Sequence, residues 1–129
     1  MAGHERGVVL LGEDDDVQRE LLREVLEAEG YRVLPAASAS ELVSRLAEQP
    51  DLVLMDIVGM TSPSVLRALE LPTRRTKLCL ISGATLLVRA AERLGADAYV
   101  QKPFELETLL GHVARLMGDE PRGRLPPVA

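Results

Sequence analysis

The strongest constraint on the fold is a fivefold alternation of short apolar runs with longer amphipathic segments. The runs are too short for buried helices and end in turn-forming residues, so they predict central parallel strands. The predicted strands are Val8–Gly12, Tyr31–Leu34, Asp51–Asp56, Lys77–Ser82 and Ala98–Gln101. Strands that alternate with helices imply right-handed crossovers. The sequence therefore predicts an α/β fold, a doubly wound five-stranded parallel sheet with five helices on its two faces.

The five amphipathic segments carry helix start and stop signals. The predicted helices are Asp16–Glu29, 39–49, 63–71, Thr85–Leu94 and Glu105–Met117. Ser38 begins a capping box with Glu41, and Ser62 is a predicted N-cap before a proline. Gly30 and Gly95 supply C-terminal stops. The apolar stripe predicted for the first helix consists of Val17, Leu21, Val25 and Leu26.

The size and charge of the chain restrict its function. Its 129 residues suit one domain, predicted over residues 1–117, with a flexible tail or linker over 118–129. A net charge of −5 argues against direct nucleic-acid or membrane-surface binding, which needs a basic face. The chain has one Phe, two Tyr and no Trp, too few aromatic rings for a base-stacking platform.

The single cysteine, Cys79, excludes an intrachain disulfide and any site with several cysteine ligands. It lies within an apolar run, where a thiol most often acts as a small buried hydrophobic group. The sequence shows neither a signal-peptide pattern nor an apolar stretch long enough for a membrane span. These features predict a soluble cytoplasmic protein.

Acidic residues follow two of the predicted strands. Glu13, Asp14 and Asp15 come after the first strand, and Asp56 ends the third. The acidic run alone is better explained as a solvated cap that complements a helix dipole, and Asp56 alone could simply cap a turn. The carboxyl ends of parallel strands meet in one crevice, however, and several anions there need a hard cation. The sequence therefore predicts a magnesium site.

Ser82 and Lys102 are expected at the same edge of the sheet. Either could be structural, because a serine can simply end a strand and most lysines are surface groups. Beside the carboxylates, however, a hydroxyl and an ammonium suit contacts with a phosphoryl group. Carboxylates, magnesium, lysine and hydroxyl together describe phosphoryl transfer, in which positioning and charge neutralisation carry most of the catalysis.

From Val8 to Met117 the chain resembles the receiver domain of two-component response regulators, similar to the chemotaxis regulators, which have a flavodoxin-like (β/α)5 fold. The matching pieces are Val9-Leu10-Leu11-Gly12-Glu13-Asp14-Asp15, Pro50-Asp51-Leu52-Val53-Leu54-Met55-Asp56, Leu80-Ile81-Ser82-Gly83, Gly95-Ala96-Asp97-Ala98-Tyr99-Val100 and Lys102-Pro103-Phe104. No single piece is specific, but five in the right order indicate the family.

The resemblance implies a role for each matching residue. Asp56 would accept a phosphoryl group from the phosphohistidine of a sensor histidine kinase or a histidine phosphotransfer protein. Magnesium would bind Glu13, Asp14, Asp56 and the backbone carbonyl of Val58. Lys102, followed by a cis peptide to Pro103, would contact the acyl phosphate. Ser82 would swing toward the phosphoryl group and let Tyr99 turn inward.

The implied function is a phosphorylation-controlled switch rather than an enzyme with a separate substrate. The phosphate would change partner binding at a face formed by the fourth helix, the fifth strand and the fifth helix. Leu86, Leu87 and Val88 lie in that fourth helix; either two face the core, or together they form a patch for an unknown downstream protein or a homodimer.

Two loops depart from the family pattern and support an alternative. After Asp56, the usual Met-Pro is missing, and the loop after Ser82 is shorter and less polar than usual. The alternative is a pseudo-receiver, a binding module that no longer cycles phosphate. A flavodoxin-like cofactor binder or a phosphatase is disfavoured, since the chain lacks a glycine-rich phosphate loop and a second aspartate after Asp56.

Overall fold

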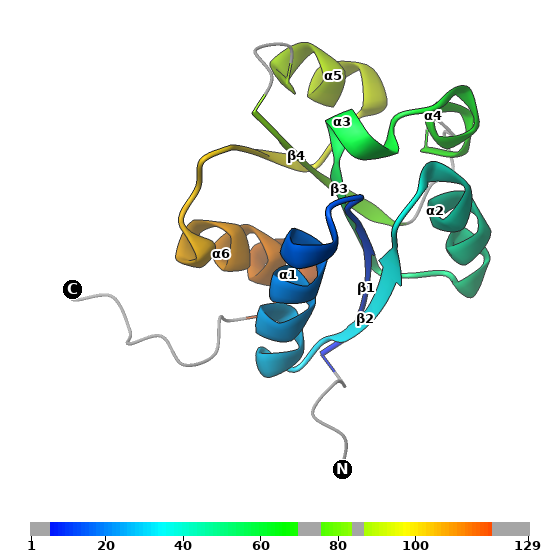
Figure 1. Cartoon of the computed structure of the whole chain (residues 1–129). Helices are drawn as coiled ribbons and strands as arrows, with labels where there is room; N and C mark the ends of the chain where they lie inside the picture. The colour runs from blue at the N-terminus through cyan, green and yellow to red at the C-terminus, as the bar shows by residue number, and fades with distance from the viewer. Residues whose placement is uncertain (1–5, 70–75, 84–86, 120–129) are drawn as a thin grey trace.

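A computed structural model describes residues 6–69, 76–83 and 87–119 of the chain (Figure 1). Five parallel strands form one sheet in the order β2-β1-β3-β4-β5. The strands are β1 (Val8–Gly12), β2 (Arg32–Ala36), β3 (Leu52–Asp56), β4 (Lys77–Ser82) and β5 (Ala98–Gln101). The predicted α/β fold with a five-stranded parallel sheet is confirmed.

Helices cover both faces of this sheet, as Figure 1 shows. On one face lie α1 (Asp16–Ala28) and α6 (Leu106–Met117). The other face carries α2 (Ala39–Arg45), α3 (Ile57–Met60), α4 (Pro63–Leu69) and α5 (Leu87–Leu94), and a short 3-10 helix (Leu46–Glu48) follows α2. Ser62 accepts a hydrogen bond from the Val65 N–H and caps α4 as predicted.

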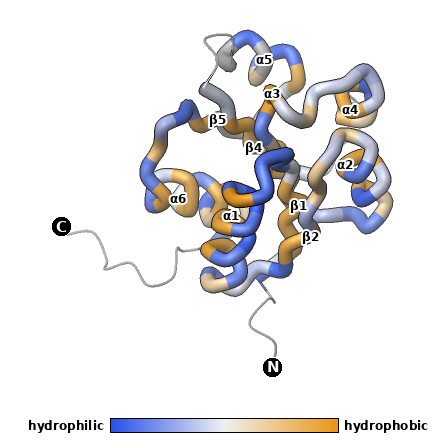
Figure 2. Tube along the Cα trace, viewed as in Figure 1, coloured by the Kyte–Doolittle hydropathy of each residue, from blue (hydrophilic) through white to orange (hydrophobic). Residues whose placement is uncertain are grey.

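Side chains that alternate along the strands supply the two cores. In β3, Leu52 and Leu54 face α1 and α6, whereas Val53 and Met55 face the other layer, and all four are fully buried. Figure 2 shows the central strands as predominantly hydrophobic. A strand buried on both faces reads as a continuous apolar run, which is why these segments were recognisable in the sequence.

The described ranges contain six α-helices rather than the five predicted, because the short helix α3 follows β3 directly. The Asp56 carboxylate accepts a hydrogen bond from the Val58 N–H and caps this single turn. Val58 therefore lies in a helix rather than in a loop. In the capping box of α2, Ser38 accepts from the Glu41 N–H as expected, but the Glu41 carboxylate accepts from Ala37 rather than from Ser38.

Two further expectations need correction. Strand β2 extends to Ala36 through Pro35, which is tolerated because β2 lies at the edge of the sheet. On α1, the buried side chains are Leu22 and Leu26, whereas Val17 and Leu21 are exposed. The helix carries more apolar positions than one stripe, and its docking on the sheet selects which of them are buried.

Cys79 is fully buried in the sheet, as predicted for a structural thiol, and burial raises its pKa to about 12. None of the helices in the described ranges is long and apolar enough to span a membrane.

Tyr31 joins both ends of the described chain at the amino-terminal end of β2, at the opposite end of the strands from Glu13 and Asp56. The Arg6 guanidinium lies 5.0 Å from the centroid of the Tyr31 ring, and the Tyr31 hydroxyl donates to Asp119 at 3.3 Å. Gly118 ends α6 with a positive φ of 75°. Two residues assigned to the tail thus belong to the described structure, whereas 120–129 lie outside the described residues and their assignment to a tail stays a prediction.

We expect the stability of the protein to fall at alkaline pH because of Tyr31. Burial raises the pKa of Tyr31 from 10.0 to about 12, and the Asp119 charge adds to this against the opposing effect of Arg6. A raised native pKa contributes stability that is present below pH 10 and lost as the pH rises through about 12. Urea denaturation at several pH values in this range gives the free energy of unfolding. This free energy should fall less steeply with pH for Tyr31→Phe than for the native protein. Equal slopes against pH would contradict the prediction.

Candidate functional site

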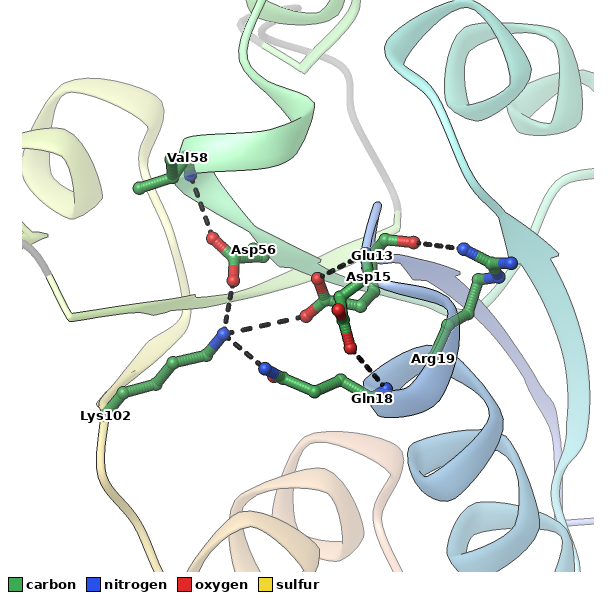
Figure 3. A network of polar contacts seen from close by, with 7 residues as sticks. All are labelled: Glu13, Asp15, Gln18, Arg19, Asp56, Val58 and Lys102. Carbon is green, nitrogen blue, oxygen red and sulfur yellow. Dashed lines mark hydrogen bonds and ion pairs between the residues drawn. The ribbon is translucent and has the colours of Figure 1, made fainter.

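The site lies at the carboxyl-terminal edge of the sheet, where β1, β3, β4 and β5 end (Figure 3). Glu13 directly follows β1, Asp56 is the last residue of β3, and Lys102 directly follows β5. Because the strands are parallel, these residues, far apart in sequence, meet at one edge. The structure thus brings Glu13, Asp56 and Lys102 together as the sequence predicts.

Both carboxylate oxygens of Asp56 are engaged. Oδ1 accepts a hydrogen bond of 2.9 Å from the Val58 N–H, and Oδ2 lies 2.5 Å from Lys102 Nζ. The residue is only 6% exposed, so its carboxylate is stabilised by these two donors rather than by bulk water. An oriented, largely desolvated carboxylate has the geometry of a nucleophile.

The Lys102 ammonium contacts three groups, which come from β3, from α1 and from the segment between β1 and α1. Besides Asp56, it donates to Gln18 Oε1 at 3.0 Å and forms an ion pair with Glu13 Oε1 at 3.7 Å (Figure 3). Partial burial by itself lowers the pKa of Lys102, but the hydrogen bond and charge of Asp56 and the charge of Glu13 raise it overall. Lys102 therefore stays protonated and neutralises part of the acidic charge. The Lys102–Pro103 peptide is cis, as the resemblance implies.

Glu13 is the most buried carboxylate of the site, with 2% of its surface exposed. Burial raises its pKa, and the negative charge of Asp56 adds to that effect, while the Asp15 N–H and Lys102 oppose it. Oε2 accepts a hydrogen bond from the Asp15 N–H, whereas Oε1 is the buried side-chain oxygen of the described chain that lacks a hydrogen-bond partner. A buried carboxylate oxygen without a donor is an unsatisfied group that a cation can stabilise.

The other two acidic residues of the run have different positions. Asp15 accepts a hydrogen bond from the Gln18 N–H and is therefore the N-cap of α1. Asp14 is exposed, and its carboxylate lies against Gly59 in α3. The donor types present, carboxylates and a peptide carbonyl, are those that magnesium prefers. Within the described ranges, however, no group of three or more acidic, histidine or cysteine side chains is gathered closely enough to hold a metal ion, so the ligand set stays a prediction.

The two predicted switch residues lie on neighbouring strands. Ser82 is fully buried at the end of β4, and its carbonyl accepts a hydrogen bond from the Lys102 N–H at 2.9 Å. Tyr99 in β5 is 46% exposed and lines a pocket of about 440 Å³ together with His112 and Arg115 of α6. The ring is therefore accessible to solvent, and its role as a switch stays a prediction. Leu86 lies outside the described residues, and so the apolar patch predicted around it stays a prediction.

The sequence alone did not indicate two residues of the site, Gln18 and Arg19. Gln18 accepts from the Lys102 ammonium, and Arg19 Nη1 donates to the Glu13 carbonyl at 2.9 Å. Both contacts depend on the position of the first turn of α1, which Asp15 caps. In the sequence, the only indication of these two contacts was that both residues are polar and lie in the first turn of a helix that follows a strand. Such residues are common, so the indication is weak.

Comparisons with known proteins agree with this arrangement. The family model described as the response regulator receiver domain matches residues 9–114. The chemotaxis protein CheY of Halobacterium salinarum is 31% identical over 115 residues, which cover 84% of this chain and 95% of that protein. The transcriptional regulatory protein PdtaR of Mycobacterium tuberculosis is 34% identical over 107 residues, covering 79% of this chain and 52% of PdtaR.

Solved structures show the same fold. A receiver domain protein (CheY-like) from Methanospirillum hungatei superimposes with a TM-score of 0.77 at 27% identity, covering 86% of this chain and 93% of that one. The chain spans about half the length of several curated relatives, which are transcriptional regulatory proteins. The family match, the CheY relative and the shared sheet together lead to one conclusion: the chain belongs to the response regulator receiver domain family of two-component signalling.

Proposed function

We propose that this receiver domain accepts a phosphoryl group on Asp56 and acts as a phosphorylation-dependent switch. The observation that carries the proposal is the placement of Asp56, a desolvated carboxylate with one oxygen on the Lys102 ammonium and the other on a backbone N–H. The donor would be the phosphohistidine of a sensor histidine kinase or of a histidine phosphotransfer protein. The domain would act on itself and turn over no separate substrate.

In the proposed reaction, an Asp56 oxygen attacks the phosphorus atom, a P–O bond forms and the P–N bond of the phosphohistidine breaks. The electron pair of that bond stays on the imidazole, and Asp56 becomes an acyl phosphate. The Lys102 ammonium, already 2.5 Å from Asp56, balances the negative charge that the phosphoryl oxygens bring. Burial of Asp56 limits the access of water to the acyl phosphate.

Glu13, Asp14, Asp56 and the Val58 carbonyl would hold one magnesium ion at this site. When bound, the ion supplies charge neutralisation for the carboxylates and the phosphoryl oxygens. The Oε1 atom of Glu13 supports this assignment, because it is buried and accepts no hydrogen bond, and the Lys102 ammonium at 3.7 Å offsets only part of the acidic charge.

Phosphorylation of Asp56 would change the position of Ser82, and this change would alter the position of Tyr99. Ser82 ends β4 beside Gln101 of β5, two residues beyond Tyr99, so a movement at Ser82 reaches the strand that carries the ring. An inward turn of Tyr99 would remodel the pocket at α5, β5 and α6. This surface would contact a downstream partner, which the sequence does not name, or a second copy of the chain.

The proposal is tested by labelling with a small phosphodonor. Incubation with magnesium and acetyl phosphate should add the mass of one phosphoryl group to the native protein, because Asp56 is oriented for attack. Hydroxylamine should remove it, since it cleaves acyl phosphates. Intact-protein mass spectrometry measures both steps.

Two variants make the result specific to the site. Asp56→Asn should take no label, whereas Asp51→Asn, a change of the same type at the opposite end of β3, should be labelled like the native protein. If neither acetyl phosphate nor a histidine kinase labels the native protein, and fluoroberyllate leaves its spectrum unchanged, the domain is a phosphorylation-independent binding module instead.

A further inference from the structure

The side chain of Gln18 extends from the first turn of α1 toward Lys102, as Figure 3 shows. Gln18 Oε1 accepts a hydrogen bond of 3.0 Å from Lys102 Nζ, although the two residues are 84 positions apart in the sequence. The same ammonium donates to Asp56 Oδ2 at 2.5 Å. The Lys102 ammonium is thus held by one oxygen atom from β3 and by another from α1.

The position of Gln18 is itself fixed by the acidic residues of the site. The Gln18 N–H donates to Asp15 Oδ2 at 2.8 Å, and the Asp15 N–H donates to Glu13 Oε2 at 3.1 Å. The other carboxylate oxygen of Glu13 lies 3.7 Å from Lys102 Nζ. Glu13, Asp15, Gln18 and Lys102 therefore form a closed ring of polar contacts. Gln18 is the member of this ring whose side chain carries no charge.

The side chain of Lys102 needs a restraint if its charge is to act at one point. A lysine ammonium is a compact charge with three donors on a flexible four-carbon stem. The Lys102 side chain is 27% exposed, so packing restrains it only in part. The neutral amide of Gln18 provides a restraint without placing a third negative charge beside Asp56 and Glu13. It therefore does not repel an anionic phosphoryl group as a carboxylate would.

We infer that Gln18 is a positioning residue, which fixes the Lys102 ammonium beside Asp56 before a phosphoryl group arrives. The kinetic consequence of this inference rests on the proposed function. A charge that is already in place needs no reorganisation during the reaction, so it stabilises the transition state more than a mobile charge does. Removal of the Gln18 acceptor should therefore make Lys102 more mobile and slow the phosphorylation of Asp56.

The first experiment measures the mobility of Lys102 in the unphosphorylated protein in EDTA. The chain contains two lysines, Lys77 and Lys102, so lysine labelled with ¹³C gives only two sets of side-chain signals. Lys77 is exposed at the start of β4 and serves as the internal reference. Carbon relaxation at Cε gives an order parameter for each side chain. This order parameter should be higher for Lys102 than for Lys77, and equal values would overturn the inference.

Three variants show whether Gln18 is the cause of this restraint. Gln18→Met removes the acceptor oxygen at an exposed position with little change in helix propensity, and it should lower the order parameter of Lys102 toward that of Lys77. Gln18→Glu keeps an acceptor oxygen and should preserve the native value. Gln49→Met makes the same exchange at an exposed position just before β3, at the opposite end of the strands from Lys102, and should change neither signal. An unchanged order parameter of Lys102 in Gln18→Met would overturn the inference.

The second experiment measures the rate at which acetyl phosphate phosphorylates Asp56. Gln18→Met should slow the reaction by about 2-fold to 10-fold, the effect expected for one hydrogen bond. In a Lys102→Met background, Gln18→Met should cause no further slowing, because the group that Gln18 positions is gone. Gln49→Met should react at the native rate. Equal slowing by Gln18→Met in both backgrounds would overturn the inference, as would a native or faster rate for Gln18→Met alone.

The two measurements separate this inference from the proposed function. Failure of the native protein to accept a phosphoryl group would overturn the proposed function, and with it the kinetic consequence of Gln18. The order parameters would still decide whether Gln18 holds Lys102. Normal labelling of Asp56 together with an unchanged mobility of Lys102 in Gln18→Met would overturn only the positioning role.

Discussion

Lys102→Met should slow the phosphorylation of Asp56 by acetyl phosphate by about 10²–10³-fold, the usual effect of removing one preorganised electrostatic donor. Lys102 Nζ is the cation that contacts both Asp56 and Glu13 in the described structure. Methionine keeps much of the length and apolar stem of lysine but has no charge. The incoming phosphoryl group would therefore meet two carboxylates without their ammonium partner. Quenched time points analysed by intact-protein mass spectrometry give the rate.

Lys77 provides the matched control for this substitution. Lys77 is exposed and is the first residue of β4, so it lies at the amino-terminal ends of the strands, opposite to Lys102. Lys77→Met makes the same change in net charge and should leave the rate at the native value. A similar slowing in both variants would mean that net charge, rather than the contact of Lys102 with Asp56, controls the reaction.

Leu54→Ala should destabilise the domain by about 2–5 kcal/mol, the usual cost of truncating a buried leucine. Leu54 is fully buried at the centre of β3, which is the middle strand of the sheet, and it belongs to the core shared with α1 and α6. A rigid strand cannot collapse into the cavity, so most of the lost packing stays lost. Equilibrium urea denaturation measures the change in the free energy of unfolding.

The same substitution at an exposed position tests the packing argument. Leu21 on α1 is 48% exposed, and Leu21→Ala should change the free energy of unfolding by no more than about 0.5 kcal/mol. Alanine also favours the helix, which offsets part of the lost contact. Comparable losses at Leu21 and Leu54 would show that burial in the structure does not determine the cost.

Most of the site could be expected from the sequence because of one geometric rule. Residues that follow parallel strands of one sheet share an edge, and so Asp56 and Lys102 could be placed together although they are 46 positions apart. The same reasoning placed Glu13 beside them. It did not distinguish the roles of Asp14 and Asp15, because that difference depends on the first turn of α1, where Asp15 caps the helix and Asp14 turns toward Gly59.

The extra helix α3 was missed for a local reason. Its four residues are too few to show any hydrophobic period, and the turn depends on a cap from Asp56, the proposed phosphoacceptor itself. An aspartate that follows a strand can be read from the sequence as a helix cap or as a functional group, and the sequence does not show that one side chain has both roles. The structure alone shows that the cap and the turn coincide at this residue.

The sequence by itself determined the class of fold, the two-sided burial of the strands and the edge at which the polar residues gather. These follow from hydrophobic period and strand direction, which local sequence encodes. Only the tertiary structure decided which stripe of α1 is buried, that Gln18 reaches Lys102 across 84 positions, and that Asp14 rests on Gly59. The physical reason is that such contacts depend on how helices dock on the sheet, and docking is set by the packing of all the elements together.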